Sequence, residues 1–206
     1  MTKRSLTVQR ILLSALTLTV LGCGSPPESK QVQAEYDKQT GKLRQLTYDS
    51  NKNGKPDSFS YMDGTKVLRV EIDKDEDGKI ERWEYYGADQ KLEKVGLSRI
   101  NDGKVDEWAY QAPDGTVAKI EISTKHDGKV NRTEFYEKSA LVRAEEDTDG
   151  NGALDKWETY SNGMLTSVAF DTEGAGRPTR RLVYGKDGTL SRIETGAALQ
   201  TDPSRP

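Results

Sequence analysis

The sequence predicts an all-β protein, a repetitive antiparallel β-hairpin meander, and three observations carry this prediction. Apolar side chains alternate with a period of two residues, as in Phe59 with Tyr61 and Trp83 with Tyr85, which is the period of a β-strand. Only 33% of the residues are apolar and 32% are charged, which is too little apolar side chain for a thick core. Glycine recurs at intervals of 24 or 25 residues, at Gly54, Gly78, Gly103, Gly128, Gly152 and Gly176.

A second apolar series keeps the same spacing half a repeat away from the glycines, at Leu43, Val67, Leu92, Val117, Leu141, Leu165 and Leu190. About six and a half repeats of 24 or 25 residues therefore fill residues 34–195. Each repeat has room for two strands joined by a short turn such as Ser161-Asn162-Gly163, so we expect roughly thirteen strands. A helix over 90–97 is the competing interpretation, and the β-branched residues elsewhere argue against it.

Stacked hairpins of this kind should form an elongated or curled single sheet. One hairpin buries too little surface to be stable alone, so each repeat depends on its neighbours. The sequence leaves open whether the sheet stays open, curls into a shell or closes.

The first 22 residues are typical of a secretion signal. Lys3, Arg4 and Arg10 precede an apolar stretch over 11–21 that is too short to span a bilayer. Residues 23–33, with two adjacent prolines, are predicted to be a flexible tether, and residues 196–206 a disordered tail.

The residues Val20, Leu21, Gly22 and Cys23 resemble the lipobox of bacterial lipoproteins. The resemblance implies that Cys23 carries the lipid and anchors the protein to a membrane. Gly24 follows where an aspartate would favour the inner membrane, so the analogy points to the outer membrane of the cell envelope. The alternative is an ordinary signal peptide that happens to contain a cysteine.

Composition excludes several classes of function. One cysteine and one histidine rule out a disulfide framework and a Cys/His zinc site. The 31 basic and 34 acidic side chains leave no positive field for a nucleic acid, so none is expected as a partner. The histidine, His126, is predicted to be a solvated side chain.

Two glycine-centred loops carry acidic side chains at alternate positions. Asp73, Asp75 and Asp77 precede one glycine, and Asp147 and Asp149 precede another. A hard divalent cation takes six to eight oxygen ligands, and carboxylates at every second residue converge on one point only if the chain bends, which glycine permits. The alternative is a set of solvated turns in which Asp and Gly serve turn chemistry alone.

Both loops resemble the calcium loop of the EF-hand family over its twelve positions, although no amphipathic helix flanks them. The resemblance implies Ca²⁺ ligands at positions 1, 3, 5, 9 and 12, namely Asp73, Asp75, Asp77, Glu81 and Glu84 in one loop and Asp147, Asp149, Asn151, Asp155 and Glu158 in the other. Whether the position-12 residues Glu84 and Glu158 reach the ion from a strand is open. A weaker third loop offers Asp49, Asn51, Asn53 and Asp57, so two or three ions are expected.

Three tryptophans, Trp83, Trp108 and Trp157, occupy matching positions in their repeats. Such a row is typical of cross-strand packing, and it also loosely resembles the aromatic hairpins of choline- and glucan-binding repeats, which would make it a surface for stacking sugars.

The repeats as a whole are similar in pattern to bacterial MORN-like and YD-type repeats. The expected function is that of a lipid-anchored, calcium-binding, non-enzymatic envelope protein that acts as a structural or interaction module. The alternative is a carbohydrate-binding envelope or matrix protein that uses the tryptophan row. An enzyme is the third class, and no repeat contains a unique pair of nucleophile and base.

Overall fold

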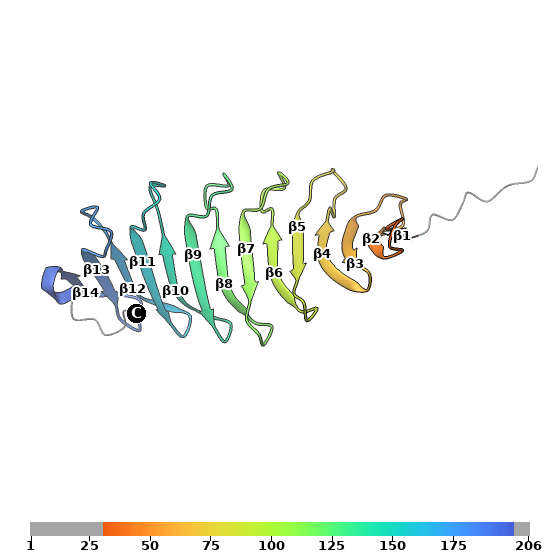
Figure 1. The fold of residues 1–206 in the computed structure, drawn as a ribbon. Helices are drawn as coiled ribbons and strands as arrows, with labels where there is room; N and C mark the ends of the chain where they lie inside the picture. The colour runs from red at the N-terminus through yellow and green to blue at the C-terminus, as the bar shows by residue number, and fades with distance from the viewer. Residues whose placement is uncertain (1–30, 200–206) are drawn as a thin grey trace, which may run out of the picture.

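The computed structural model describes residues 31–199, which form one open sheet of fourteen antiparallel strands in sequence order. The strands are β1 (Val32–Tyr36), β2 (Leu43–Tyr48), β3 (Ser58–Asp63), β4 (Lys66–Ile72), β5 (Arg82–Tyr86), β6 (Leu92–Leu97), β7 (Glu107–Gln111), β8 (Val117–Ile122), β9 (Arg132–Glu137), β10 (Ala140–Glu146), β11 (Lys156–Ser161), β12 (Met164–Phe170), β13 (Arg180–Tyr184) and β14 (Leu190–Thr195). A 3-10 helix, η1 (Gly196–Leu199), follows β14. The predicted hairpin meander is confirmed, and the sheet is an elongated ribbon that does not close (Figure 1).

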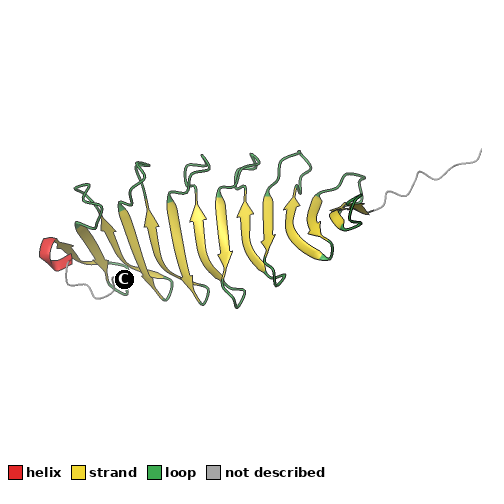
Figure 2. Cartoon of the chain, viewed as in Figure 1, coloured by secondary structure: helices red, strands yellow, loops and turns green. Residues whose placement is uncertain are grey.

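The strands are joined alternately by short turns on one edge of the ribbon and by longer loops on the other (Figure 2). All six longer loops have nine residues: 49–57, 73–81, 98–106, 123–131, 147–155 and 171–179. We call them the nine-residue loops and name each by the strands that it joins. Because they share one edge, side chains from successive loops come close together.

The register sets two different faces on the sheet. Residues directly opposite each other on neighbouring strands share a face, and side chains alternate between faces along a strand. The aromatic face carries the row Phe59, Glu71, Trp83, Gly96, Trp108, Glu121, Thr133, Glu145 and Trp157. The glutamate face carries the row Val70, Glu84, Val95, Ala109, Ile120, Glu134, Ala144, Glu158 and Val168.

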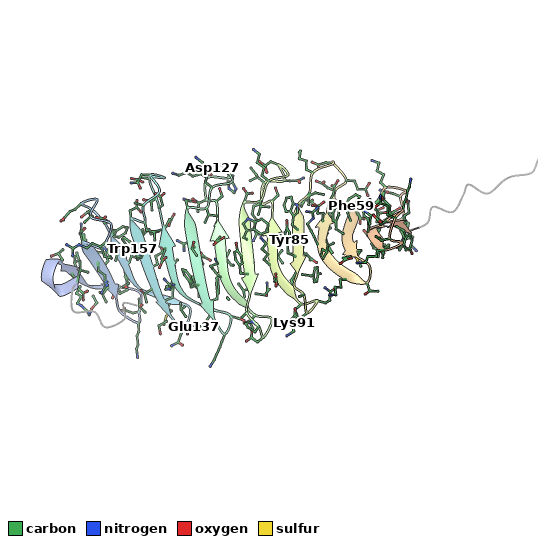
Figure 3. The ribbon with its side chains drawn as sticks, in the orientation of Figure 1. Phe59, Tyr85, Lys91, Asp127, Glu137 and Trp157 are labelled. Atoms are coloured by element: carbon green, nitrogen blue, oxygen red, sulfur yellow. The ribbon has the colours of Figure 1, made fainter. Side chains whose placement is uncertain are left out.

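The core is thin, as the composition predicted. Among residues 31–199, the buried apolar side chains are Val95, Ala144, Val168, Ala169 and Leu199. Most other strand side chains are half-buried on one face or the other, and Figure 3 shows them projecting from the ribbon. Each strand pairs only with its sequence neighbours, so stability is a sum over adjacent strands.

Three predicted boundaries differ from the structure. Fourteen strands replace the expected thirteen, because β1 begins at Val32, inside the segment assigned to the tether. The competing helix over 90–97 is wrong, since β6 covers most of that range. The predicted disordered tail is wrong for Gly196–Leu199, where η1 forms and Leu199 is buried.

The secretion signal, the lipidated Cys23 and residues 200–206 lie outside the described residues. Within residues 31–199, no helix has the length and apolar character needed to cross a bilayer.

Candidate metal centre

The nine-residue loops share one hydrogen-bonded frame. In five of them the first side chain accepts a hydrogen bond from the amide of the sixth residue, a glycine with positive φ, as Asp73 does from Gly78 at 2.9 Å and Asp147 from Gly152 at 2.8 Å. The ninth side chain accepts from the amide of the second residue in all six, as Glu81 does from Lys74 at 2.5 Å. These contacts close each loop.

The frame does not require carboxylates. Ser123 accepts the amide of Gly128 at 3.2 Å, and Asn131 accepts that of Thr124 at 2.8 Å, so a hydroxyl and an amide close loop β8–β9 in the same way. Thr179 closes loop β12–β13 with its hydroxyl. Turn chemistry therefore explains a polar side chain at the first and ninth positions, but not the concentration of charge in loops β4–β5 and β10–β11.

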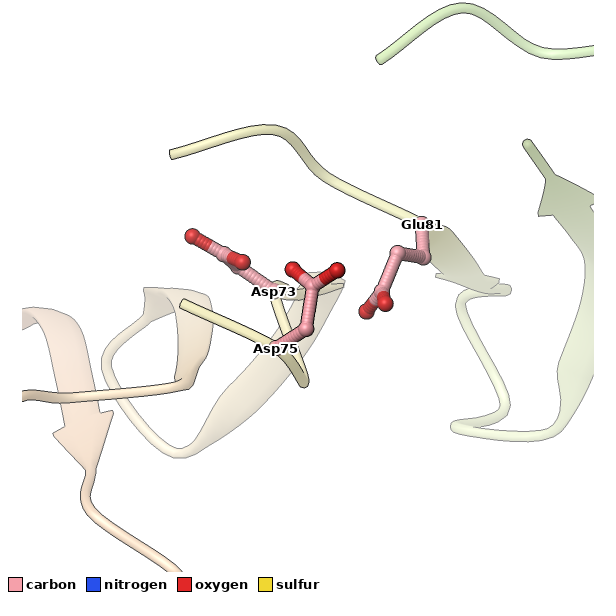
Figure 4. Close-up of side chains that lie close together, drawn as sticks. All are labelled: Asp73, Asp75 and Glu81. Atoms are coloured by element: carbon pink, nitrogen blue, oxygen red, sulfur yellow. The ribbon is translucent and has the colours of Figure 1, made fainter. Parts of the chain in front are cut away.

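Two loops bring three carboxylates together. One oxygen each from Asp73, Asp75 and Glu81 lie within 4.8 Å of one another. The same holds for Asp147, Asp149 and Asp155, at the same positions of loop β10–β11. Figure 4 shows the first group, with the carboxylates of Asp75 and Glu81 turned toward each other and that of Asp73 beside them. Groups of carboxylate oxygens at this separation can hold a hard divalent cation.

Asp73 is the most informative residue of the first group. Its side chain lies at the base of the loop, and the residue is only 7% exposed. One oxygen accepts the Gly78 amide, while the other, Oδ1, is buried and has no hydrogen-bond partner among the described residues. A buried carboxylate oxygen without a donor is costly, and a bound cation would remove that cost.

Asp147 is held differently in the second group. Its Oδ1 accepts amides from Gly150 at 2.7 Å and Asn151 at 3.2 Å, and its Oδ2 accepts that of Gly152. These backbone donors, Gly152 first, lower the pKa of Asp147. The carboxylate therefore stays ionised at neutral pH, as a cation ligand must be.

The position-5 side chains lie outside these groups of three carboxylates. Asp77 accepts the backbone amide of Lys79 at 2.8 Å and its ammonium at 3.0 Å, and the ammonium contact lowers the pKa of Asp77. Asn151 accepts the amide of Ala153 at 2.7 Å and donates to Asp149 at 3.0 Å.

Loop β2–β3 has only two carboxylates, Asp49 and Asp57. The amides of Asn51 and Asn53 donate to Glu76 of the next loop, each at 2.6 Å. Asp57 closes the loop through the amide of Ser50 at 3.0 Å.

The position-12 glutamates are not brought to the loops. Glu84 and Glu158 are the third residues of β5 and β11 and lie on the glutamate face. Glu84 accepts from Arg82 and Tyr86, both at 2.7 Å. Because the nine-residue loop ends three residues earlier, a twelve-position loop resemblance overextends into the strand.

Sequence reasoning missed the motif that these glutamates belong to. In three strands a basic residue precedes the glutamate by two positions and a tyrosine follows it by two, namely Arg82-Glu84-Tyr86, Arg132-Glu134-Tyr136 and Lys156-Glu158-Tyr160. The recurrence of these residue types at a spacing of two, which places them on one face of a strand, was the signal that identifies the motif.

The motif is electrostatically tight. Arg132 lies between three glutamates, 2.9 Å from Glu134, 3.0 Å from Glu146 and 2.8 Å from Glu158. Burial raises the pKa of Glu158, but hydrogen bonds from Lys156 and Arg132 outweigh burial and leave it lowered. Burial, with the hydrogen bond to the glutamate, raises the pKa of the motif's Tyr86 and Tyr136 to about 12.

On the aromatic face, Trp108 is a packing residue. It lies against Gly96, with its ring 5.8 Å from that of Tyr85, and the ammonium of Lys94 lies 4.4 Å above it. Cation–π contacts continue along the face, for example between Arg69 and Tyr61 at 4.1 Å. This confirms the packing role for one tryptophan of the row.

Trp157 has different surroundings. It lines a hollow of about 480 Å³ with Leu154, Glu145, Ala169 and Arg181. Its cross-strand neighbours in the row are Glu145 and the small Ala169, so no second ring lies directly opposite it.

His126 is not simply solvated, contrary to the prediction. Its Nδ1 lies 3.2 Å from Oδ1 of Asp106, a carboxylate buried at the end of the preceding loop. The contact joins loop β8–β9 to loop β6–β7.

No family model matches the chain, and no curated protein is significantly similar to it. Solved structures with partial similarity include Staphylococcus aureus TarM, both alone and as a mutant in complex with fondaparinux, alpha-GlcNAc-glycerol and UDP. Each is 17% identical, with a TM-score of 0.38 over 48% of this chain and 19% of TarM. A Streptococcus pneumoniae complex of accessory secretory proteins 1, 2 and 3 is 13% identical, with a TM-score of 0.26 over 77% of this chain and 22% of the other. The chain thus spans about a fifth of each of these proteins.

Proposed function

We propose that this protein is a calcium-binding β-repeat scaffold without enzymatic activity, in which cations at loops β4–β5 and β10–β11 stabilise a thinly packed sheet. The observation that carries the proposal is the pair of three-carboxylate groups at equivalent loop positions, around Asp73 and around Asp147. The serine, asparagine and threonine of the other loops support it, because they close the same frame without the charge.

The donor set favours calcium over other metals. It consists of oxygen atoms, with neither cysteine nor histidine, and such sites suit Ca²⁺, Mg²⁺ or Mn²⁺. A flexible loop of carboxylates on an exposed edge matches the variable geometry of Ca²⁺ better than the compact octahedron of Mg²⁺. Loop β2–β3 is a third, weaker candidate because it has fewer charges of its own.

The location follows from the N-terminal sequence. We propose that Cys23 carries a lipid and holds the sheet at the outer membrane, where extracellular calcium is available and disulfides are absent as stabilisers. There the ribbon offers two broad faces to an envelope protein or a glycan. The absence of a basic field argues against nucleic acid.

A carbohydrate-binding role is the second candidate, and the hollow beside Trp157 is the observation that favours it. A tryptophan ring without an aromatic neighbour, next to Glu145 and Arg181, combines a stacking surface with polar groups. Glycan-dependent quenching of tryptophan fluorescence that Trp157→Ala removes, and that calcium does not affect, would support this role. Binding that survives the substitution would contradict it.

Thermal unfolding tests the calcium proposal. With dissociation constants of about 10⁻⁴ M, about 1 mM calcium adds about 1.4 kcal/mol per site, or about 3 kcal/mol for two sites. The midpoint of unfolding should rise by about 6–12 °C and return when a chelator is added. Identical melting curves with calcium and with chelator would refute the proposal.

A further inference from the structure

The fourth residue of each nine-residue loop connects that loop to the one before it. Its backbone is left-handed in all six loops, with φ between 53° and 84°. In three loops its side chain reaches back: Glu76 accepts from Asn51, Asn101 donates to Asp75 at 2.6 Å, and the imidazole of His126 lies beside a buried carboxylate. The six residues are Lys52, Glu76, Asn101, His126, Gly150 and Gly174.

Asn101 is the one that reaches the three-carboxylate group of loop β4–β5. Its Nδ2 lies 2.6 Å from Oδ2 of Asp75 and 3.5 Å from Oδ2 of Asp77. Its Oδ1 is buried and has no hydrogen-bond partner among the described residues. The two ends of an amide are nearly the same size, so a half-turn about the Cβ–Cγ bond would put Oδ1 where Nδ2 lies.

A second oxygen without a donor belongs to the same group. Asp73, 7% exposed, has its buried Oδ1 unpaired. Buried polar atoms are normally satisfied, and unpaired ones are costly. Two of them at one acidic group, one from each of two successive loops, call for a positive charge between the loops.

We propose that the cation of loop β4–β5 is bound by two successive repeats, with Oδ1 of Asn101 as a ligand beside Asp73, Asp75 and Glu81. This rests on the proposed calcium function and extends it, because the ion then joins loop β6–β7 to loop β4–β5 as well as closing one loop. The second group has no such ligand, since the fourth residue of the following loop is Gly174. The two sites therefore differ: one bridges repeats and the other is local.

Calorimetric titration of the full chain with calcium chloride tests this on one site at a time. Asp147→Asn together with Asp149→Asn leaves only the first site. In that background, Asn101→Ala should raise the dissociation constant about tenfold, which is the effect of losing one ligand contact to a charge. Asn101→Asp should lower it by a similar factor, because affinity rises with ligand charge.

The matched control is His126→Ala, which removes the side chain at the same loop position beside a loop without a carboxylate group. It should leave the calcium affinity of the first site unchanged. Unchanged affinity in both Asn101 variants would overturn the proposal and make Asn101 a hydrogen-bond partner of Asp75 only. If the parent chain binds no calcium at all, it is the proposed function that fails.

Gly174→Asn supplies the converse test should Asn101→Ala not fold. Its backbone has φ of 68°, which asparagine tolerates better than other side chains, and no atom lies within 4 Å of an added Cβ. With Asp73 and Asp75 both changed to Asn, so that only the second site remains, Gly174→Asn should tighten calcium binding several-fold. No gain at this site, together with no change from Asn101→Asp, would exclude an inter-loop ligand.

Discussion

Single residues in the nine-residue loops have two roles that the sequence does not separate. Asp147 and Asp155 close their loop through backbone amides, and Ser123 and Asn131 do the same in a loop without a cluster. An aspartate at these positions is therefore partly turn chemistry. What distinguishes the candidate sites is the additional carboxylate at the third position, which Asp75 and Asp149 supply.

The position-12 glutamates provide the first prediction. Glu158→Gln should destabilise the fold by about 1–3 kcal/mol, because it removes the charge that faces Arg132 and Lys156 at 2.8 Å on a buried part of the sheet. Calcium affinity should not change, since Glu158 does not approach the loop carboxylates. Chemical denaturation with and without calcium measures both quantities. The exposed Glu137→Gln is the control, with an expected effect within about 0.5 kcal/mol.

A loss of calcium binding in Glu158→Gln under conditions where it remains folded would contradict this assignment. It would restore Glu158 as a metal ligand and the full twelve-position loop.

At the scale of the strand, the sequence predicted the meander because its signals were local. Alternation, hairpin turns and the glycine spacing each act within one repeat, and the sheet is built by repeating them. The sequence could not predict contacts between repeats, such as Arg132 with Glu146 and Glu158, because these depend on register across strands. The inter-loop contacts of Glu76 and Asn101 were missed for the same reason.

The packing of β6 against β7 gives a prediction at this scale. An added Cβ on Gly96 would lie 2.9 Å from Cζ3 of Trp108. Gly96→Ala should therefore cost about 1–3 kcal/mol by overpacking, although alanine is otherwise the better strand residue. Urea denaturation gives the difference.

Combining Gly96→Ala with Trp108→Leu provides the control, because the smaller side chain removes the clash. The double variant should be more stable than the sum of the two single effects implies. Additive effects would show that the ring moves aside freely and that the contact is not tight.

At the scale of the whole molecule, the ribbon spreads its polar contacts along its length because it has little core. Burial, with hydrogen bonds to glutamates, raises the pKa of Tyr86, Tyr110 and Tyr136, in three different repeats, to about 12. A tyrosine whose folded pKa lies above its unfolded value near 10 stabilises the fold fully below pH 10, and this contribution is lost as the pH rises through 12.

Alkaline titration should therefore show a group of tyrosines that ionise near pH 12 while unfolding begins above pH 10. Ultraviolet absorbance of tyrosinate, followed together with circular dichroism, separates the two events. Ionisation of every tyrosine near pH 10 without loss of strand signal would contradict the buried hydrogen bonds to glutamate.

Counting bound ions tests the central claim most directly. Equilibrium dialysis against calcium near 1 mM should give two ions per wild-type chain and one after Asp73→Asn with Asp75→Asn. It should also give one after Asp147→Asn with Asp149→Asn, and none when all four residues are changed, while the strand signal persists. A wild-type chain that binds no calcium, or a fourfold variant that binds as much as the wild type, would show that the acidic loops are turns and not metal sites.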